Sequence, residues 1–259
     1  MWTLSPRHWR NDILDHVVVA FCLLTVAAMS CQAETRIPVQ HAPADLSVDW
    51  ESFGFSLNGL RTDSMWLDKA DALSDHPSYS SSGYCVVPNG LLQLDPACTV
   101  LNYGQALFEG LKAFRRADGT IALFRQEQNA LRMRKGAERL LMPPVPIDTF
   151  VQAADAVVRA NARWVPPLGK GALYLRPLLF GSGADLGVKP SSECTFCGYC
   201  SPVGNYFKGG LKAISLQAVK GYSRAAPGGS GGVKASGNYA PAFLVQREVL
   251  PKRCHTLPH

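Results

Sequence analysis

A glycine-rich segment that runs into a single lysine constrains this chain more than any other feature. Residues 228–246 read Gly-Gly-Ser-Gly-Gly-Val-Lys-Ala-Ser-Gly-Asn-Tyr-Ala-Pro-Ala-Phe-Leu-Val-Gln, and the lysine is Lys234. Glycine lets the backbone approach a ligand closely, and a lysine held in such backbone can be desolvated enough to attack an aldehyde. Asn238 and Tyr239 follow about one helical turn later, so either could face the same ligand. Taken alone, the segment also fits an ordinary loop with a solvated lysine.

Length and charge set the scale of the fold. A chain of 259 residues fits one or two domains. Its net charge of +6 is modest and its basic residues are scattered, so nucleic-acid binding gains no support. The apolar run 17–29 is too short to span a bilayer comfortably, and residues 1–44 are expected to be an N-terminal extension or targeting segment. Arg7 and Arg10 resemble the start of a secretory signal peptide, whereas Asp12 and Asp15 suit neither that nor a transit peptide.

Three closely spaced cysteines raise the question of a metal site. Cys194, Cys197 and Cys200 form a C-x2-C-x2-C run, which is typical of metal or iron–sulfur ligands. The surrounding residues 193–203 instead predict a buried strand, along which side chains alternate between faces. Cys194 and Cys200 would then point away from Cys197, so the three thiols could not share one metal.

The middle of the chain predicts an α+β domain over residues 45–202. Two hairpins are expected, one pairing 84–87 with 91–94 across an Asn-Gly turn and one pairing 111–116 with 120–124 across Ala-Asp-Gly. Between them and the cysteine strand, helical spacing predicts two helices that back the sheet.

The expected helices and the next strand have their own signals. Leu131, Leu140 and Leu141 have helical spacing, and Asp148 is a good N-cap for a second helix. That helix carries an apolar face made of Phe150, Val151, Ala154, Val157 and Val158. Residues 172–180 predict a strand whose polar face carries Tyr174 and Arg176, as a carboxylate-binding pair or as a face in water.

Six segments of the chain, in order, resemble the branched-chain aminotransferases, which are pyridoxal-phosphate (PLP) enzymes of fold type IV. They are Val-Asp-Trp-Glu-Ser-Phe-Gly-Phe (48–55), Leu-Asn-Tyr-Gly-Gln-Ala-Leu-Phe-Glu-Gly (101–110), Leu-Phe-Arg-Gln-Glu-Gln-Asn-Ala-Leu-Arg-Met (123–133), Leu-Tyr-Leu-Arg-Pro-Leu-Leu-Phe-Gly-Ser-Gly (173–183), Ser-Pro-Val-Gly-Asn-Tyr-Phe (201–207) and the lysine segment. The resemblance covers about residues 46–249 and is greatest to the plant branch. It implies a small α+β domain, a linker at 203–210, and the start of a PLP domain at 211–249, which begins with a strand at 211–219.

The resemblance also implies a role for each site residue. Lys234 resembles the Schiff-base lysine and general acid–base, Tyr239 the partner of the ring oxygen, and Arg125 the arginine that binds the phosphate of PLP. Tyr174 would contact the α-carboxylate and Arg176 the side-chain carboxylate of glutamate. The pocket for branched side chains would be lined by Tyr103 and Phe108. Without the resemblance, Arg125 suits an ion pair at a strand end, and Tyr103 and Phe108 suit the core.

The implied activity is transamination between leucine, isoleucine or valine and 2-oxoglutarate, in a homodimer located in the chloroplast, mitochondrion or cytoplasm. The family's glutamate for the pyridine nitrogen is not found downstream of Lys234, and residues 250–259 do not continue the motif. We therefore expect a C-terminally truncated chain that is inactive or nearly so, poorly soluble and not loaded with cofactor. Two alternatives stay open: a lyase of the aminodeoxychorismate type, which uses a similar lysine, and a non-catalytic isoform that pairs with the full-length subunit.

Overall fold

The computed structural model describes residues 34–37, 43–45, 47–51, 61–73, 85–204 and 217–249. All of them belong to one compact unit, Ala33–His259, and the targeting signals expected before residue 33 lie outside the described residues. The same is true of most of the expected linker at 203–210, of residues 211–216 of the expected strand at 211–219, and of the tail at 250–259. The described part of that strand, 217–219, is not in a strand.

The fold is built on one antiparallel sheet, as the α+β prediction requires. Its strand order is β1-β6-β5-β7-β8-β2-β3, and β4 pairs with β7 beside this path. The strands are β1 Glu34–Ile37, β2 Ser64–Asp71, β3 Cys85–Pro88, β4 Ala106–Phe108, β5 Leu111–Arg115, β6 Ile121–Phe124, β7 Ala172–Gly181 and β8 Glu193–Val203. The first strand, β1, pairs with β6, so the sheet takes in residues that the sequence assigns to the N-terminal extension.

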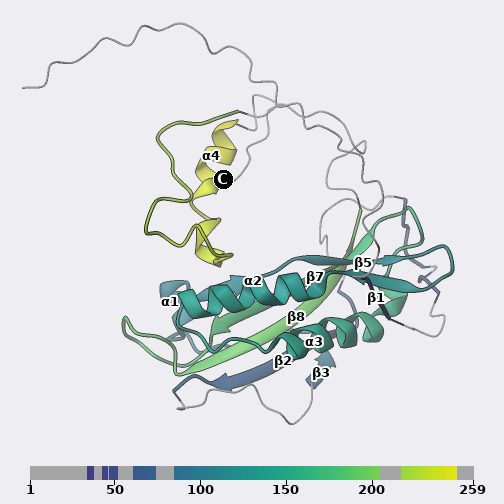
Figure 1. The fold of residues 1–259 in the computed structure, drawn as a ribbon, viewed down its shortest axis with the longest axis horizontal. Coiled ribbons are helices and arrows are strands. Elements are labelled where there is room, and N and C mark those ends of the chain that lie inside the picture. The colour runs from purple at the N-terminus through teal and green to yellow at the C-terminus, as the bar shows by residue number, and fades with distance from the viewer. Residues whose placement is uncertain are drawn as a thin grey trace, which may run out of the picture. The chain divides into compact units, whose positions relative to one another are not determined.

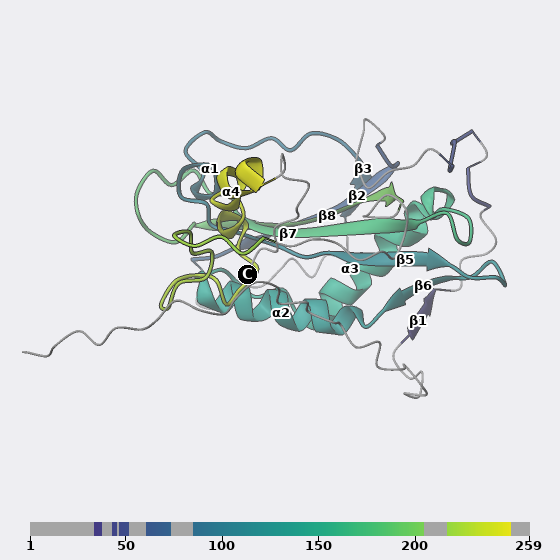
Figure 2. The same cartoon turned by 90° about the horizontal axis from the view of Figure 1, so that it is seen from above.

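Two long helices, α2 (Gln126–Arg139) and α3 (Ile147–Ala160), cover one face of this sheet (Figure 1) and lie on the same side of it in the second view (Figure 2). The main core lies between them and the strands, where Phe150, Val157 and Val158 pack with Leu173 and Phe196. A smaller apolar cluster of Met65, Ala106, Phe180 and Cys197 includes side chains from the opposite face. The remaining described helices are α1 (Thr99–Tyr103), η1 (Ala162–Trp164), η2 (Ser236–Asn238) and α4 (Ala242–Val249).

The alternation predicted for the two longest strands is confirmed. On β7, Leu173 and Leu175 are buried whereas Tyr174 and Arg176 are half-buried. On β8, Cys194 and Cys200 pack in the main core, and Cys197 packs in the cluster that reaches the other face. Burial raises the pKa of the Cys197 thiol to about 11 and the pKa values of Cys194 and Cys200 to about 12.

One of the two predicted hairpins is confirmed and the other is wrong. Strands β5 and β6 pair across the Ala-Asp-Gly turn, where Gly119 has a φ of 80°. By contrast, β3 pairs with β2, and residues 91–94 form no strand. The physical reason lies in Asn89, whose backbone N–H donates to Asp63 O at 2.9 Å and whose side chain donates to Thr62 Oγ1 at 3.2 Å. These bonds direct the chain back to the start of β2.

The helices differ from the sequence prediction in detail. Helix α3 begins at Ile147 with Pro146 at the N-cap, so Asp148 lies in its first turn and does not cap it. The expected apolar face of α3 is confirmed at Phe150, Ala154, Val157 and Val158. In and after α2, however, Leu131 and Leu141 are exposed, because small side chains such as Ala130 and Ala137 fill the contact with the sheet.

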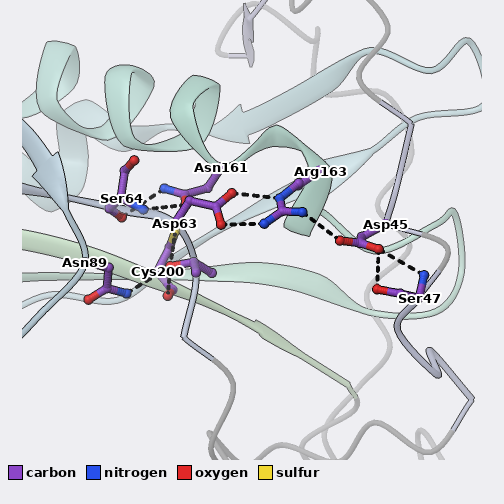
Figure 3. A network of polar contacts seen from close by, with 9 residues as sticks. Asp45, Ser47, Asp63, Ser64, Asn89, Asn161, Arg163 and Cys200 are labelled. Atoms are coloured by element: carbon purple, nitrogen blue, oxygen red, sulfur yellow. Dashed lines mark hydrogen bonds and ion pairs between the residues drawn. The ribbon is translucent and has the colours of Figure 1, made fainter.

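A polar network fastens the start of β2 to the end of α3 (Figure 3). The Arg163 guanidinium donates to both oxygens of Asp63, at 2.8 and 2.6 Å, and to Asp45 at 3.0 Å. The Arg163 hydrogen bonds hold the pKa of Asp63 below its usual value. The buried Asn161 side chain accepts from Ser64 N–H at 2.9 Å and donates to Ser64 O at 3.0 Å. Asp45 is thereby tied, through Arg163, to Asp63 at the start of β2. Within the described ranges no helix has both the length and the apolar character needed to cross a bilayer.

Candidate functional site

The backbone of β4 holds the Lys234 segment in place. Phe108 N–H donates to Lys234 O at 3.2 Å, and Leu107 and Ala235 form an antiparallel bridge. The turn before the lysine is closed by Asn238, whose buried side-chain amide donates to Ser230 O and Val233 O at 2.8 and 2.9 Å. Asn238 therefore supports the turn, and it is Tyr239 that shares a site with the lysine.

The Lys234 amine lies between two aromatic rings. Its Nζ donates to Tyr239 Oη at 2.9 Å and is 4.3 Å from the centroid of the Phe108 ring. The Phe108 and Tyr239 rings are 4.8 Å apart, with an angle of 59° between their planes. The lysine is thus oriented by a phenol and partly enclosed by apolar surface, which is the environment that a nucleophilic amine requires.

A second cation reaches the same Phe108 ring from β7. The guanidinium carbon of Arg176 is 4.6 Å from the Phe108 centroid, and Arg176 Nη2 donates to Tyr174 Oη at 2.9 Å. Arg176 Nε is buried and makes no hydrogen bond in the part of the chain that the structure describes. A buried donor without an acceptor is costly, so this arginine can bind a carboxylate that enters the site.

Sequence reasoning missed Glu109 and Arg132. The Glu109 side chain is fully buried and forms an ion pair of 2.5 Å with Arg132, whose side chain is 54% exposed. The hydrogen bond to Glu109 raises the pKa of Arg132, and Tyr239 contributes electrostatically in the same direction. Arg132 is therefore within electrostatic reach of the Tyr239 hydroxyl. An acidic residue inside the apolar segment 106–111 was the signal that could have located this pair.

The predicted site residues thus fall into two groups. Phe108, Tyr174, Arg176, Lys234 and Tyr239 are brought together as described above. Arg125 is at the N-cap of α2, exposed, and its side chain makes no hydrogen bond or ion pair with any described residue. Tyr103 ends α1 with 44% of its surface exposed and has no ring contact among the described residues. The phosphate and pocket roles of these two residues stay predictions.

The sheet and its helices define the class of protein, which is fold type IV. A branched-chain aminotransferase from Thermoproteus uzoniensis with norvaline has the same fold, with a TM-score of 0.57 at 20% identity over 74% of this chain and 57% of that one. A branched-chain amino acid aminotransferase from Thermobaculum terrenum in its PLP form gives a TM-score of 0.52 at 19% identity, over 74% of this chain and 56% of that one. No family model matches the chain.

The chain is also similar in sequence to several named plant proteins. The chain is 48% identical over 219 residues to the chloroplastic branched-chain-amino-acid aminotransferase 2 of Arabidopsis thaliana, which covers 84% of this chain and 55% of that protein. It is 52% identical over 199 residues to a chloroplastic branched-chain amino acid aminotransferase of Humulus lupulus, with coverage of 77% and 47%. A methionine aminotransferase of Arabidopsis thaliana is 45% identical, over 76% of this chain and 54% of that protein. The chain is therefore homologous to the plant branched-chain aminotransferases, and it spans about half the length of the curated relatives it matches.

Proposed function

We propose that this protein is a PLP-dependent aminotransferase that exchanges the amino group of leucine, isoleucine or valine with 2-oxoglutarate. The observation that carries the proposal is the Lys234 amine, hydrogen-bonded to Tyr239 at 2.9 Å and in contact with the Phe108 ring. The names of the relatives support the same reaction. Since a methionine aminotransferase is nearly as similar, the choice of amino-acid side chain needs its own assay.

The residues present fit PLP. Lys234 would hold the aldehyde carbon and Tyr239 the ring oxygen. A fixed cation is needed for the phosphate, and Arg132, which is held by the buried Glu109 and interacts electrostatically with Tyr239, is a second candidate beside the predicted Arg125 at the start of α2. The buried Arg176 Nε, which lacks an acceptor among the described residues, suits a substrate carboxylate.

Each side chain then has a task in the reaction. PLP, when bound, supplies an electrophilic aldehyde and a ring that withdraws electrons from the amino-acid Cα. Lys234 Nζ accepts the proton from Cα as a general base. Tyr174 Oη and the Arg176 guanidinium bind and orient the carboxylates of the substrate. Phe108, which packs against both cations, excludes water from that side of the amine.

Borohydride trapping tests the assignment of Lys234. The 259-residue chain is incubated with PLP, reduced with borohydride and digested, and the labelled peptides are identified by mass spectrometry. We expect the label on the Lys234 peptide, its loss in Lys234→Ala, and its retention in the control Lys135→Ala, which removes an exposed lysine. Label spread evenly over surface lysines would refute the assignment.

Adding a substrate before the reduction tests the reaction. Leucine should remove label from Lys234, because the amino acid competes with the lysine for the same aldehyde. Isoleucine, valine and methionine are compared in the same way. Aminodeoxychorismate is included to test the lyase alternative, and removal of label by that compound alone would favour a lyase.

The family homodimer and an organellar location belong to the same proposal. Relatives at 46–52% identity are named chloroplastic or mitochondrial. Sedimentation velocity of the purified chain measures its oligomeric state, and a fluorescent protein fused after residue 60 reports the compartment in plant cells.

A further inference from the structure

The ion pair between Glu109 and Arg132 has an unequal burial that a surface pair would not have. Glu109 Oε1 accepts from Arg132 Nε at 2.6 Å, and Oε2 accepts from Arg132 Nη2 at 2.5 Å. The carboxylate is fully buried, whereas the arginine side chain is 54% exposed. A buried carboxylate is stable only when its oxygens are satisfied, so the core depends on where this arginine lies.

Two further donors hold the carboxylate in one orientation. Asn129 Nδ2 donates to Glu109 Oε2 at 2.8 Å, and the Gly110 N–H donates to the same oxygen at 3.3 Å. Asn129 and Arg132 are three residues apart on α2 and therefore lie on one face of that helix. Glu109 uses the Nε and Nη2 groups of Arg132, and Nη1 makes no hydrogen bond with it.

The pair is joined to the lysine site through the chain. Glu109 directly follows Phe108, the last residue of β4. Phe108 contacts Lys234 and Tyr239, and Glu109 contacts Asn129 and Arg132 of α2. The same helix reaches the glycine-rich segment at its C-terminal end, where Arg139 Nη2 donates to Gly228 O at 3.3 Å.

We propose that Glu109 is a positioning residue, whose buried carboxylate fixes the Arg132 guanidinium so that an anionic group of a ligand held at Lys234 meets a cation in one orientation. The inference rests on the proposed function. An unpaired arginine on an exposed helix face samples many rotamers. Fixing it in advance removes the entropic cost of ordering it when a ligand binds, which raises affinity for the anion.

The test compares PLP with pyridoxal, which carries the same aldehyde without the phosphate. For each compound, the concentration that gives half-maximal borohydride-trapped label on Lys234 is measured in the wild type, Glu109→Gln, Arg132→Met and the double variant. The matched control is Glu138→Gln, since Glu138 pairs with Arg134 at 3.4 Å on the exposed face of the same helix. Thermal unfolding shows which variants are folded.

The wild type should prefer PLP over pyridoxal by roughly tenfold or more, as one fixed charge-assisted contact implies. Glu109→Gln should lose most of this preference while its labelling by pyridoxal changes little. Arg132→Met should lose the preference too, and the double variant should be no worse than Arg132→Met. The control should keep it. A Glu109→Gln protein that keeps the wild-type preference, or that loses labelling by both compounds in parallel, overturns the proposal.

A second variant and a chemical modification test the proposal if the first experiment gives no result. If Glu109→Gln does not fold, Asn129→Ala removes one of the carboxylate's hydrogen bonds and leaves both charges, and an unchanged PLP preference then contradicts the proposal. If the wild type is labelled at Lys234 by neither compound, the proposed function fails on its own. Modification of Arg132 by phenylglyoxal then decides the role of Glu109: a rate that rises several-fold in the folded variant, with Arg134 unchanged, supports it, and equal rates overturn it.

Discussion

At the residue scale, Arg125 is held in a backbone conformation that its side chain disfavours. It has a φ of 48° and a ψ of 45° at the N-cap of α2, and this left-handed region costs an L-residue about 1–2 kcal/mol. Arg125→Gly should raise the free energy of unfolding by about 0.5–1 kcal/mol, because the relief of strain exceeds the added chain entropy of glycine. Chemical denaturation followed by circular dichroism measures this change.

The matched control for that substitution lies within the same helix. Lys135 is exposed in the middle of α2, and Lys135→Gly should lower the free energy of unfolding by about 1 kcal/mol. If both glycine variants lose stability equally, the strain at Arg125 is refuted. Labelling of Lys234 by PLP in the Arg125→Gly protein also separates the predicted phosphate role of Arg125 from the role proposed for Arg132.

The cysteines on β8 should be chemically inert in the folded protein. Thiolate is the reactive form, and burial raises the pKa of Cys197 to about 11 and the pKa values of Cys194 and Cys200 to about 12. Near neutral pH, iodoacetamide should therefore label the exposed Cys85 and spare these three until denaturant is added. Peptide mass spectrometry gives the rate at each position. Labelling of Cys194 or Cys200 as fast as Cys85 would show that β8 opens readily.

At the element scale, strands could be predicted where the local sequence alone determines their burial. Residues 193–203 were predicted as a strand with the observed bounds, because apolar and small side chains run through it without interruption. Residues 91–94 have a similar composition, but the hairpin fails since Asn89 bonds to residues 62 and 63, far away in sequence. Periodicity reports local structure, and it does not reveal which distant segment competes for a backbone group.

Only part of the candidate site could be predicted from the local sequence pattern. Lys234, Tyr239 and Arg176 lie in segments whose spacing predicted them as site residues, and the structure brings all three to the Phe108 ring. Tyr174 joins this group through its hydrogen bond with Arg176. Spacing does not separate Arg125 from Arg132 as candidates for the phosphate, because both follow the same strand closely. The two differ in that Arg132 has a buried partner, Glu109, and burial is a property of the assembled fold.

The loop between β7 and β8 should depend on pH through one carboxylate. Asp185 accepts from the Ser192 hydroxyl at 2.5 Å and the Ser192 N–H at 2.6 Å, and it pairs with Lys189 at 3.0 Å. These contacts, led by the Ser192 hydroxyl, lower the pKa of Asp185 to about 2 from 3.8. A lowered pKa stabilises the fold above the unfolded-state pKa, and the contribution is lost as pH falls through the folded-state pKa.

Asp185→Asn should accordingly lower the melting temperature at pH 7, and the difference from the wild type should shrink between pH 3.8 and about 2. Ser192→Ala removes the largest cause of the shift and raises the folded-state pKa, so its acid-induced loss of stability should be smaller and should end at a higher pH than in the wild type. Melting curves recorded by circular dichroism across this range measure both effects. A difference between Asp185→Asn and the wild type that stays constant down to pH 2 would contradict the assignment.

At the scale of the whole molecule, the sheet holds both carboxylate-binding candidates on β7, and β4 joins this strand to the lysine segment. The lysine site is therefore assembled from segments more than a hundred residues apart in sequence, which is why its stability depends on the complete sheet. Substitutions in the main core should weaken PLP labelling of Lys234 only through global unfolding, whereas substitutions at Phe108 or Tyr239 should weaken it in the folded protein.

The described surface exposes apolar side chains of α4, and this should govern the behaviour of the purified chain. Phe243 and Leu244 are 63% and 43% exposed, so little of the roughly 1.5–3 kcal/mol that burial of such a side chain contributes is obtained. The 259-residue chain is expected to bind hydrophobic dyes such as anilinonaphthalene sulfonate under native conditions.

The double variant Phe243→Ser with Leu244→Ser should show weaker dye fluorescence and higher solubility at an unchanged melting temperature. Gln246→Ser, at an exposed polar position of the same helix, controls for the change in helix propensity and should leave dye binding as it is. Dye binding that is absent in the wild type, or equal in the wild type and the double variant, would mean that α4 does not form the adhesive surface.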